Sequence, residues 1–138
     1  MDEFKIIKPL SNYDITDIMK SVSNFRGVFM RDELKILKKD NNECMIINYD
    51  LSKNPGTHWV SLFTRNGKSY YFDPFGLSPL PEVVMYCKRP RVYNTFEIQN
   101  PGEVICGHLC AYVLLKLTYG FEFYEVLDEL YRYNRKCI

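Results

Sequence analysis

Cys106 and His58 are the residues of this chain whose types and positions are most suited to chemistry. His58 is one of only two histidines and directly precedes the single tryptophan, Trp59, while Cys106 opens an apolar segment. A thiol at the start of a helix meets free N–H groups and the positive end of the helix dipole, which lower its pKa. A thiolate beside an imidazole is a nucleophile–base pair. Taken singly, a buried structural cysteine and a structural histidine are the commoner interpretations.

Asp73 is placed to orient the imidazole of such a pair. His58 starts an expected strand, and the hairpin signal Asn66-Gly67 folds the next strand back beside it, ending at Asp73-Pro74. In an antiparallel pair the start of one strand and the end of the other share one sheet edge. The sequence therefore predicts a Cys-His-Asp set, although Asp-Pro is also a common way to end a strand.

Gln99 supplies a fourth group, seven residues before Cys106 and across the turn signal Asn100-Pro101-Gly102. If the loop doubles back, the Gln99 amide can donate to a developing oxyanion together with the backbone N–H of Cys106. The alternative is a solvent-exposed loop glutamine.

The spacing of apolar residues and the positions of turn-forming residues predict the helices and strands that hold these groups. Expected helices cover a segment from a Ser11 cap to about Asn24, 79–87, 106–119 and 121–134, with 32–39 as a short helix or a loop. Expected strands cover 43–48, 58–64, 70–72 and 92–98, with 25–30 as a turn or extended link and 51–57 as a loop.

Composition bounds the class of protein. The chain has 138 residues, 46% of them hydrophobic and 25% charged, which predicts one globular α+β domain over residues 1–138. A net charge of +1 excludes a strongly basic nucleic-acid binder. The longest apolar run, 109–115, is too short to cross a bilayer.

Cysteine usage favours reduced thiols and no metal. The chain has five cysteines, an odd number, and none of them form a CxxC pair. The acidic start Met1-Asp2-Glu3 does not resemble a secretory signal, so we expect a compartment in which thiols stay reduced. A metal site from His58, Cys106, His108 and Cys110 is disfavoured, because helix positions i and i+2 face different sides.

These motifs, in this order, resemble the adenovirus-type cysteine proteases, within the superfamily that includes the proteases of ubiquitin-like modifiers. The resemblance covers roughly residues 25–119. It rests on the segment 43–48, on Pro55-Gly56-Thr57-His58-Trp59-Val60, on Tyr70-Tyr71-Phe72-Asp73-Pro74-Phe75-Gly76, and on the interval from Gln99 to Cys106-Gly107.

The resemblance implies a papain-like fold of the adenain type: a small central mixed β-sheet packed between helices, with the nucleophile at the N-terminus of a buried helix. It implies the triad His58, Asp73 and Cys106, with an oxyanion hole from Gln99 and the Cys106 backbone. It also implies substrate binding by Trp59, Asp32 and Gly107. The implied activity is a cysteine endopeptidase, a viral maturation protease that cuts capsid or core precursors after Gly, at Gly-Gly or small-x-Gly sites.

The chain departs from the adenovirus enzymes where activators are concerned. Those enzymes use a viral peptide and DNA, so the resemblance implies a peptide or DNA activator as one option. This chain has only the small basic cluster Lys88-Arg89-Pro90-Arg91, and none of its cysteines aligns clearly with a peptide tether. We therefore expect a monomer that requires no cofactor. We expect it to act on viral structural precursor proteins in a virion or in the host nucleus or cytoplasm, and to contact no membrane.

Two other functions are compatible with the same residues. One is an isopeptidase of the deubiquitinase or SUMO-protease type, which would use the same site on a folded modifier. The other is a catalytically degraded protease fold that serves as a binding module. The presence of all four groups argues against the latter, since a binding module has no physical need for them.

Overall fold

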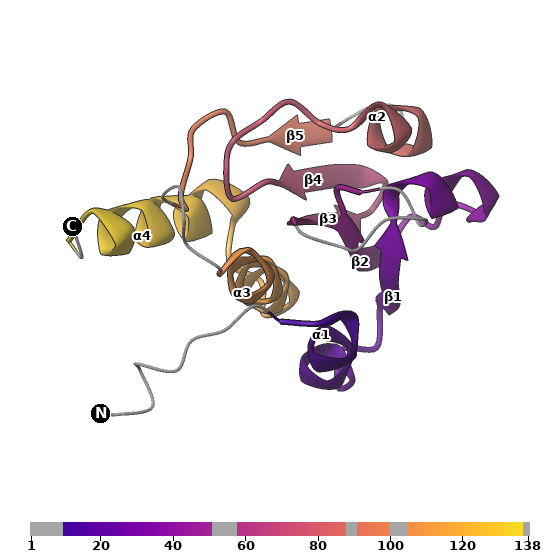
Figure 1. Ribbon diagram of the computed structural model, residues 1–138, viewed down its shortest axis with the longest axis horizontal. Helices are drawn as coiled ribbons and strands as arrows, with labels where there is room; N and C mark the ends of the chain where they lie inside the picture. Colours follow the sequence, from indigo (N-terminus) through magenta and orange to yellow (C-terminus); the bar gives the residue numbers. More distant parts are fainter. Residues whose placement is uncertain (1–9, 51–57, 88–90, 100–104, 137–138) are drawn as a thin grey trace.

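The computed structural model describes residues 10–50, 58–87, 91–99 and 105–136, and it centres on a mixed five-stranded sheet (Figure 1). The strands lie in sequence order, with β1 and β2 parallel, β2, β3 and β4 antiparallel, and β4 and β5 parallel. Their bounds are β1 Phe25–Met30, β2 Glu43–Asn48, β3 Trp59–Arg65, β4 Lys68–Phe72 and β5 Arg91–Tyr93.

Helices cover both faces of the sheet. The helices α1, α3 and α4 enclose one core cluster, and α2 with the 3-10 helix η2 encloses the other (Figure 1). Their bounds are α1 Asn12–Met19, η2 Arg31–Ile36, α2 Pro81–Cys87, α3 Cys106–Thr118 and α4 Phe123–Lys136.

The central strands are apolar because both of their faces are covered. All six residues of β2 are buried, and β3 is buried from Trp59 to Thr64. Side chains alternate along a strand, so Trp59 and Phe63 pack on the α3 side while Val60 and Leu62 pack on the α2 side. This double covering fixes the position of α3, and with it Cys106 at the start of that helix, against β3.

The β3–β4 hairpin confirms its turn signal. Asn66 and Gly67 both have positive φ, 51° and 81°, as a two-residue hairpin turn requires. The register pairs Ser61 with Phe72. His58 and Asp73 therefore lie just outside the same end of this hairpin, as the spacing predicted.

Most expected elements are present, with three differences. The segment 25–30 is a full strand, β1, because it pairs parallel with β2, a long-range partner that its own pattern does not reveal. The strand expected over 92–98 is only β5, and 94–99 turns toward Asp73 instead. The helix expected from Ser11 to about Asn24 ends at Met19. The segment 32–39, expected as a short helix or a loop, contains most of the 3-10 helix η2. The expected features at 51–57, 88–90 and 100–102 lie outside the described residues.

Candidate active site

His58 and Asp73 meet at the hairpin end. His58 Nε2 lies 2.8 Å from Asp73 Oδ1, and the Asp73 side chain is fully buried. The imidazole is clamped on its faces by aromatic rings: Phe75 stacks on it with centroids 4.6 Å apart, and Tyr49 lies tilted at 5.7 Å. The ring is therefore held in one plane, with Nε2 committed to the carboxylate.

Cys106 is the second group that interacts with the His58 ring. Within the described chain Nδ1 of His58 is buried and makes no regular hydrogen bond, so it remains to exchange a proton with the thiol. Burial alone lowers the pKa of His58, but the hydrogen bond to Asp73 and the interaction with Cys106 outweigh it and raise that pKa to about 9. Protonated His58 is thus the stable form at neutral pH.

The thiol is shifted in the opposite direction. Burial alone raises the pKa of Cys106, but interaction with the His58 ring and with the backbone N–H groups of Trp59 and Gly107 outweighs it and lowers that pKa below its usual value. Cys106 is the first residue of α3, and its N-cap, Ile105, offers no side-chain acceptor to the helix start. The free N–H groups and the dipole end of α3 therefore face the sulfur.

The Trp59 peptide connects β3 to α3. Its N–H group interacts with the Cys106 sulfur and lowers the pKa of that thiol. Its carbonyl oxygen accepts a hydrogen bond from the Cys110 thiol at 3.3 Å. The indole is only 7% exposed, and its Nε1 donates to the Leu10 oxygen at 3.3 Å. Trp59 is thus mainly a packing residue here, and its expected role as a wall of the substrate cleft stays a prediction.

Asp73 and Gly76 each have a structural role in the Asp-Pro-Phe-Gly turn. Asp73 Oδ1 also accepts the backbone N–H of Phe75 at 2.8 Å, which folds the turn beneath the imidazole. Gly76 has a φ of 69°, and a Cβ there would lie 2.6 Å from the backbone carbon of Phe96. Only glycine fits that approach.

Pro74 brings Gln99 to the same region. The Pro74 oxygen accepts the backbone N–H groups of Ile98 at 2.7 Å and of Gln99 at 2.9 Å, and the Gln99 side chain is 1% exposed. Gln99 is therefore not the solvent-exposed loop residue of the alternative interpretation. Its contact with an oxyanion stays a prediction.

The remaining two expected substrate-binding residues lie in different surroundings. Gly107 is buried, and a Cβ there would lie 3.3 Å from Leu10 and Trp59 and 3.4 Å from Ile15, so α3 approaches these side chains closely. Only its backbone is left to serve a substrate. Asp32 lies half-buried in η2, and its binding role stays a prediction.

Asn94 is a site residue that sequence reasoning missed. It is 1% exposed, and its side-chain amide brackets the backbone of Asp73: Oδ1 accepts from Asp73 N at 3.0 Å and Nδ2 donates to Asp73 O at 2.7 Å. A single Asn inside an expected strand does not indicate that its side chain will bind the backbone of Asp73, 21 residues earlier in the sequence.

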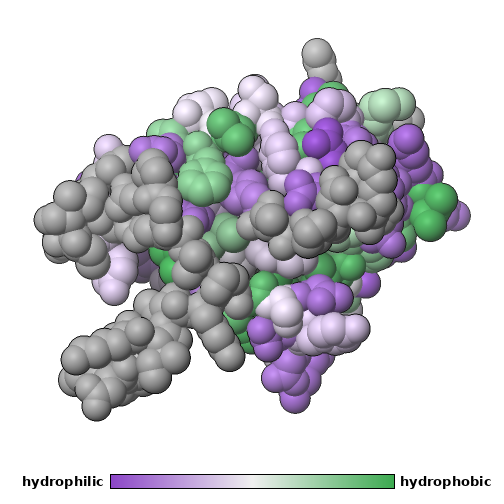
Figure 2. Space-filling model, viewed as in Figure 1, coloured by the Kyte–Doolittle hydropathy of each residue, from purple (hydrophilic) through white to green (hydrophobic). Residues whose placement is uncertain are grey.

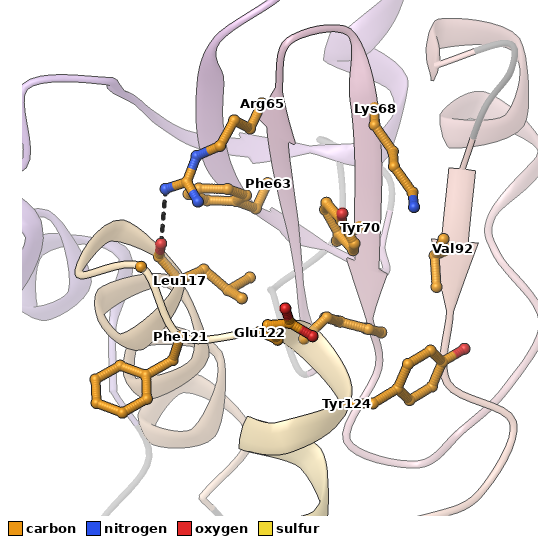
Figure 3. Close-up of a pocket in the computed structure, with 11 residues that line it drawn as sticks. Phe63, Arg65, Lys68, Tyr70, Val92, Leu117, Phe121, Glu122 and Tyr124 are labelled. Carbon is orange, nitrogen blue, oxygen red and sulfur yellow. Dashed lines mark hydrogen bonds between the residues drawn. The ribbon is translucent and has the colours of Figure 1, made fainter.

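A separate cavity of about 430 Å³ opens at the far end of β3, near Arg65 (Figure 3). It is lined by Phe63, Tyr70 and residues of the α3–α4 turn, and Arg65 donates to the Leu117 oxygen at 2.8 Å. None of His58, Asp73 and Cys106 lines it, so it is not the candidate site. The face shown in Figure 2 is largely hydrophilic, with hydrophobic side chains in small separate groups.

Metal-binding clusters and membrane-spanning helices are both absent from the described residues. In the described ranges, no three His, Cys, Asp or Glu side chains converge as a metal site would require. None of the helices in the part of the chain that the structure describes is both long enough and apolar enough to cross a bilayer. Cys44, Cys87, Cys106 and Cys110 are all free thiols.

Comparison of the whole fold with solved structures gives a clear likeness. The crystal structure of the ASFV pS273R protease superimposes with a TM-score of 0.62 at 14% identity, and that of its selenomethionine form with 0.59 at 15%. Each match covers 92% of this chain and 66% of the other. This chain shares the fold of that protease. It spans about two thirds of the length of that protease, and at this identity the likeness concerns the fold alone. No family model and no curated protein sequence matches the chain.

Proposed function

We propose that this chain is a cysteine endopeptidase in which Cys106, His58 and Asp73 act as nucleophile, acid–base and orienting acid. The observation that carries the proposal is geometric: His58 Nε2 lies 2.8 Å from the buried Asp73 carboxylate, and the thiol that interacts with the same ring is on the first residue of α3. The raised pKa of His58 and the lowered pKa of Cys106 agree with it. Both favour the thiolate–imidazolium form before substrate arrives. A buried structural cysteine shows the opposite shift. Burial raises the pKa of the Cys44 thiol to about 12.

The reaction follows from the positions of these groups. The Cys106 thiolate attacks the scissile carbonyl carbon, and the carbonyl oxygen becomes an oxyanion near the start of α3. Collapse expels the amine, which takes the proton from His58 and leaves a thioester on Cys106. Neutral His58 then takes a proton from water, whose hydroxide displaces the thiolate, and the imidazolium is restored.

Asp73 and Gln99 have supporting roles in this proposal. Asp73 holds the ring through Nε2 and stabilises its positive charge, so Nδ1 stays directed to the sulfur. The Cys106 N–H and the Gln99 amide donate to the oxyanion, which is where negative charge appears in the transition state.

We further propose that the substrates are viral precursor proteins cut after Gly, and that the chain is of the adenovirus type. The support for the adenovirus type is the Asp-Pro-Phe-Gly turn and the interval of seven residues between Gln99 and Cys106. The fold shared with the ASFV pS273R protease supports a viral protease. The modifier-isopeptidase alternative uses the same chemistry on a folded substrate.

Substrate profiling tests these statements together. A peptide library with varied residues before the cut, and an intact ubiquitin-like modifier probe, are incubated with the wild-type chain and with Cys106→Ala. We expect Gly-restricted cleavage of peptides by the wild type alone. Equal cleavage after bulky residues would contradict the Gly preference, and reaction with the modifier probe alone would favour the isopeptidase.

A further inference from the structure

Asn94 extends the β4–β5 ladder beyond the last strand residue. The parallel pairing of these strands reaches Tyr71 opposite Tyr93 and then stops. Directly after it, the Asn94 side chain accepts from the backbone N–H of Asp73 and donates to its backbone oxygen. A primary amide carries an acceptor and donors, so it can substitute for a peptide group of the missing strand.

The same segment is folded on itself and also binds the turn after Asp73 at two further places. Asn94 Nδ2 also donates to the Phe96 oxygen at 3.0 Å, which folds 94–96 into a compact bend. The Gly76 backbone lies directly against that of Phe96. The N–H groups of Ile98 and Gln99 both bind the Pro74 oxygen. We call these connections between residues 73–76 and 94–99 the Asn94 clasp.

We propose that Asn94 is a positioning residue, which through this clasp holds Asp73 beside His58 and the Gln99 backbone against the same turn, as one unit. The inference deepens the proposed function and rests on it. The Asp73 carboxylate has no surface position to relax into, because its side chain is fully buried. Its direction therefore follows its backbone, and Asn94 is bonded to both polar groups of that backbone.

Removal of the amide should act on the reaction and not only on the fold. Asn94→Ala leaves the Asp73 N–H buried without its acceptor, whereas the Asp73 oxygen keeps the Gly76 N–H at 2.8 Å. The turn after Asp73 is thus retained, but its orientation relative to His58 is no longer fixed. A misplacement of about 1 Å between reacting groups costs about 10² in turnover, so kcat should fall by roughly 10- to 100-fold with little change in KM.

The pH dependence of thiol alkylation separates positioning from a general structural role. A small alkylating agent reacts with the thiolate, so the ratio of its rates at pH 7 and pH 10 reports how much ion pair exists at neutral pH. A carboxylate displaced from His58 stabilises the imidazolium less. The ratio should therefore fall several-fold in Asn94→Ala when the adduct on Cys106 is followed by mass spectrometry and circular dichroism shows the same folded fraction at both pH values.

The experiment compares full-length wild type, Asn94→Ala, Asn94→Asp and Thr95→Ala, each normalised to titrated Cys106. Asn94→Asp keeps an acceptor for the Asp73 N–H but sets oxygen against the Asp73 and Phe96 oxygens, and serves if Asn94→Ala does not fold. Thr95 is exposed in the same segment, so Thr95→Ala should match the wild type.

The outcomes distinguish this inference from the proposed function. A reduced alkylation ratio in the Asn94 variants, with Thr95→Ala unchanged, supports the clasp. A folded Asn94 variant with a ratio and a kcat within twofold of the wild type overturns it. If the wild type hydrolyses no peptide but the ratio still falls in the variants, the proposed function fails and the positioning role of Asn94 stands.

Discussion

Asp73 is the buried end of a line of contacts in which its Oδ1 atom lies 2.8 Å from Nε2 of His58, and Cys106 interacts with the same ring. The carboxylate is fully buried, so the solvent screens its interaction with the imidazole only weakly. The positive ring in turn stabilises the thiolate.

Asp73→Asn should preserve the fold and slow turnover by roughly 10²–10⁴, because an amide can orient the ring but supports neither its charge nor the right tautomer. The Phe75 N–H can still be accepted by the side-chain oxygen at this position. Steady-state kinetics with circular dichroism measure the effect. Turnover within threefold of the wild type would remove Asp73 from the mechanism.

The pH dependence of kcat/KM should show an acid limb below the usual thiol pKa and an alkaline limb near pH 9. The active form needs the Cys106 thiolate and protonated His58, so activity rises as the thiol ionises and falls as the imidazolium, whose pKa is about 9, loses its proton. Asp73→Asn serves as the control, since its alkaline limb should move to lower pH. An alkaline limb near pH 6.5 in the wild type would contradict the ion pair.

Gln99→Ala should lower kcat by about 10²–10³, the usual cost of one oxyanion donor. Alkylation of Cys106 by a small reagent should continue at the wild-type rate, because the thiolate and His58 are untouched. The two rates are measured on the same preparation. Should kcat stay within twofold of the wild type, the buried amide serves packing alone.

Gly76→Ala should destabilise the fold by about 2–4 kcal/mol, from a left-handed φ together with overpacking against Phe96. The matched control is Gly120→Ala, which also has a positive φ, 99°, but meets nothing within 4 Å. Urea unfolding of both variants isolates the contact with Phe96. Equal losses in the two variants would show that the clasp is not tightly packed at Gly76.

The sequence predicted the parts of the site that depend on local signals. Asn66-Gly67 specifies a hairpin by itself, and once the hairpin exists, His58 and Asp73 must share an edge. The helix at Cys106 follows from an apolar run with a stop at Gly120, whose φ of 99° confirms the break.

The parts that were missed depend on partners far away in the sequence. The strand β1 exists because β2 is available for parallel pairing, and its residues show no clean alternation. The expected strand over 92–98 stops at Tyr93 because the Asn94 side chain takes the backbone groups of Asp73. Neither partner can be identified from the segment itself.

The central claim is that Cys106 is the nucleophile, and covalent capture tests it most directly. The full chain is incubated with a peptide that ends in Gly and carries a thiol-directed electrophile, and the adduct is located by proteolysis and mass spectrometry. We predict one adduct, on Cys106, that is abolished in Cys106→Ala and strongly slowed in His58→Ala. An adduct on Cys44, Cys87 or Cys110 instead, or peptide hydrolysis by Cys106→Ala at the wild-type rate, would contradict the account.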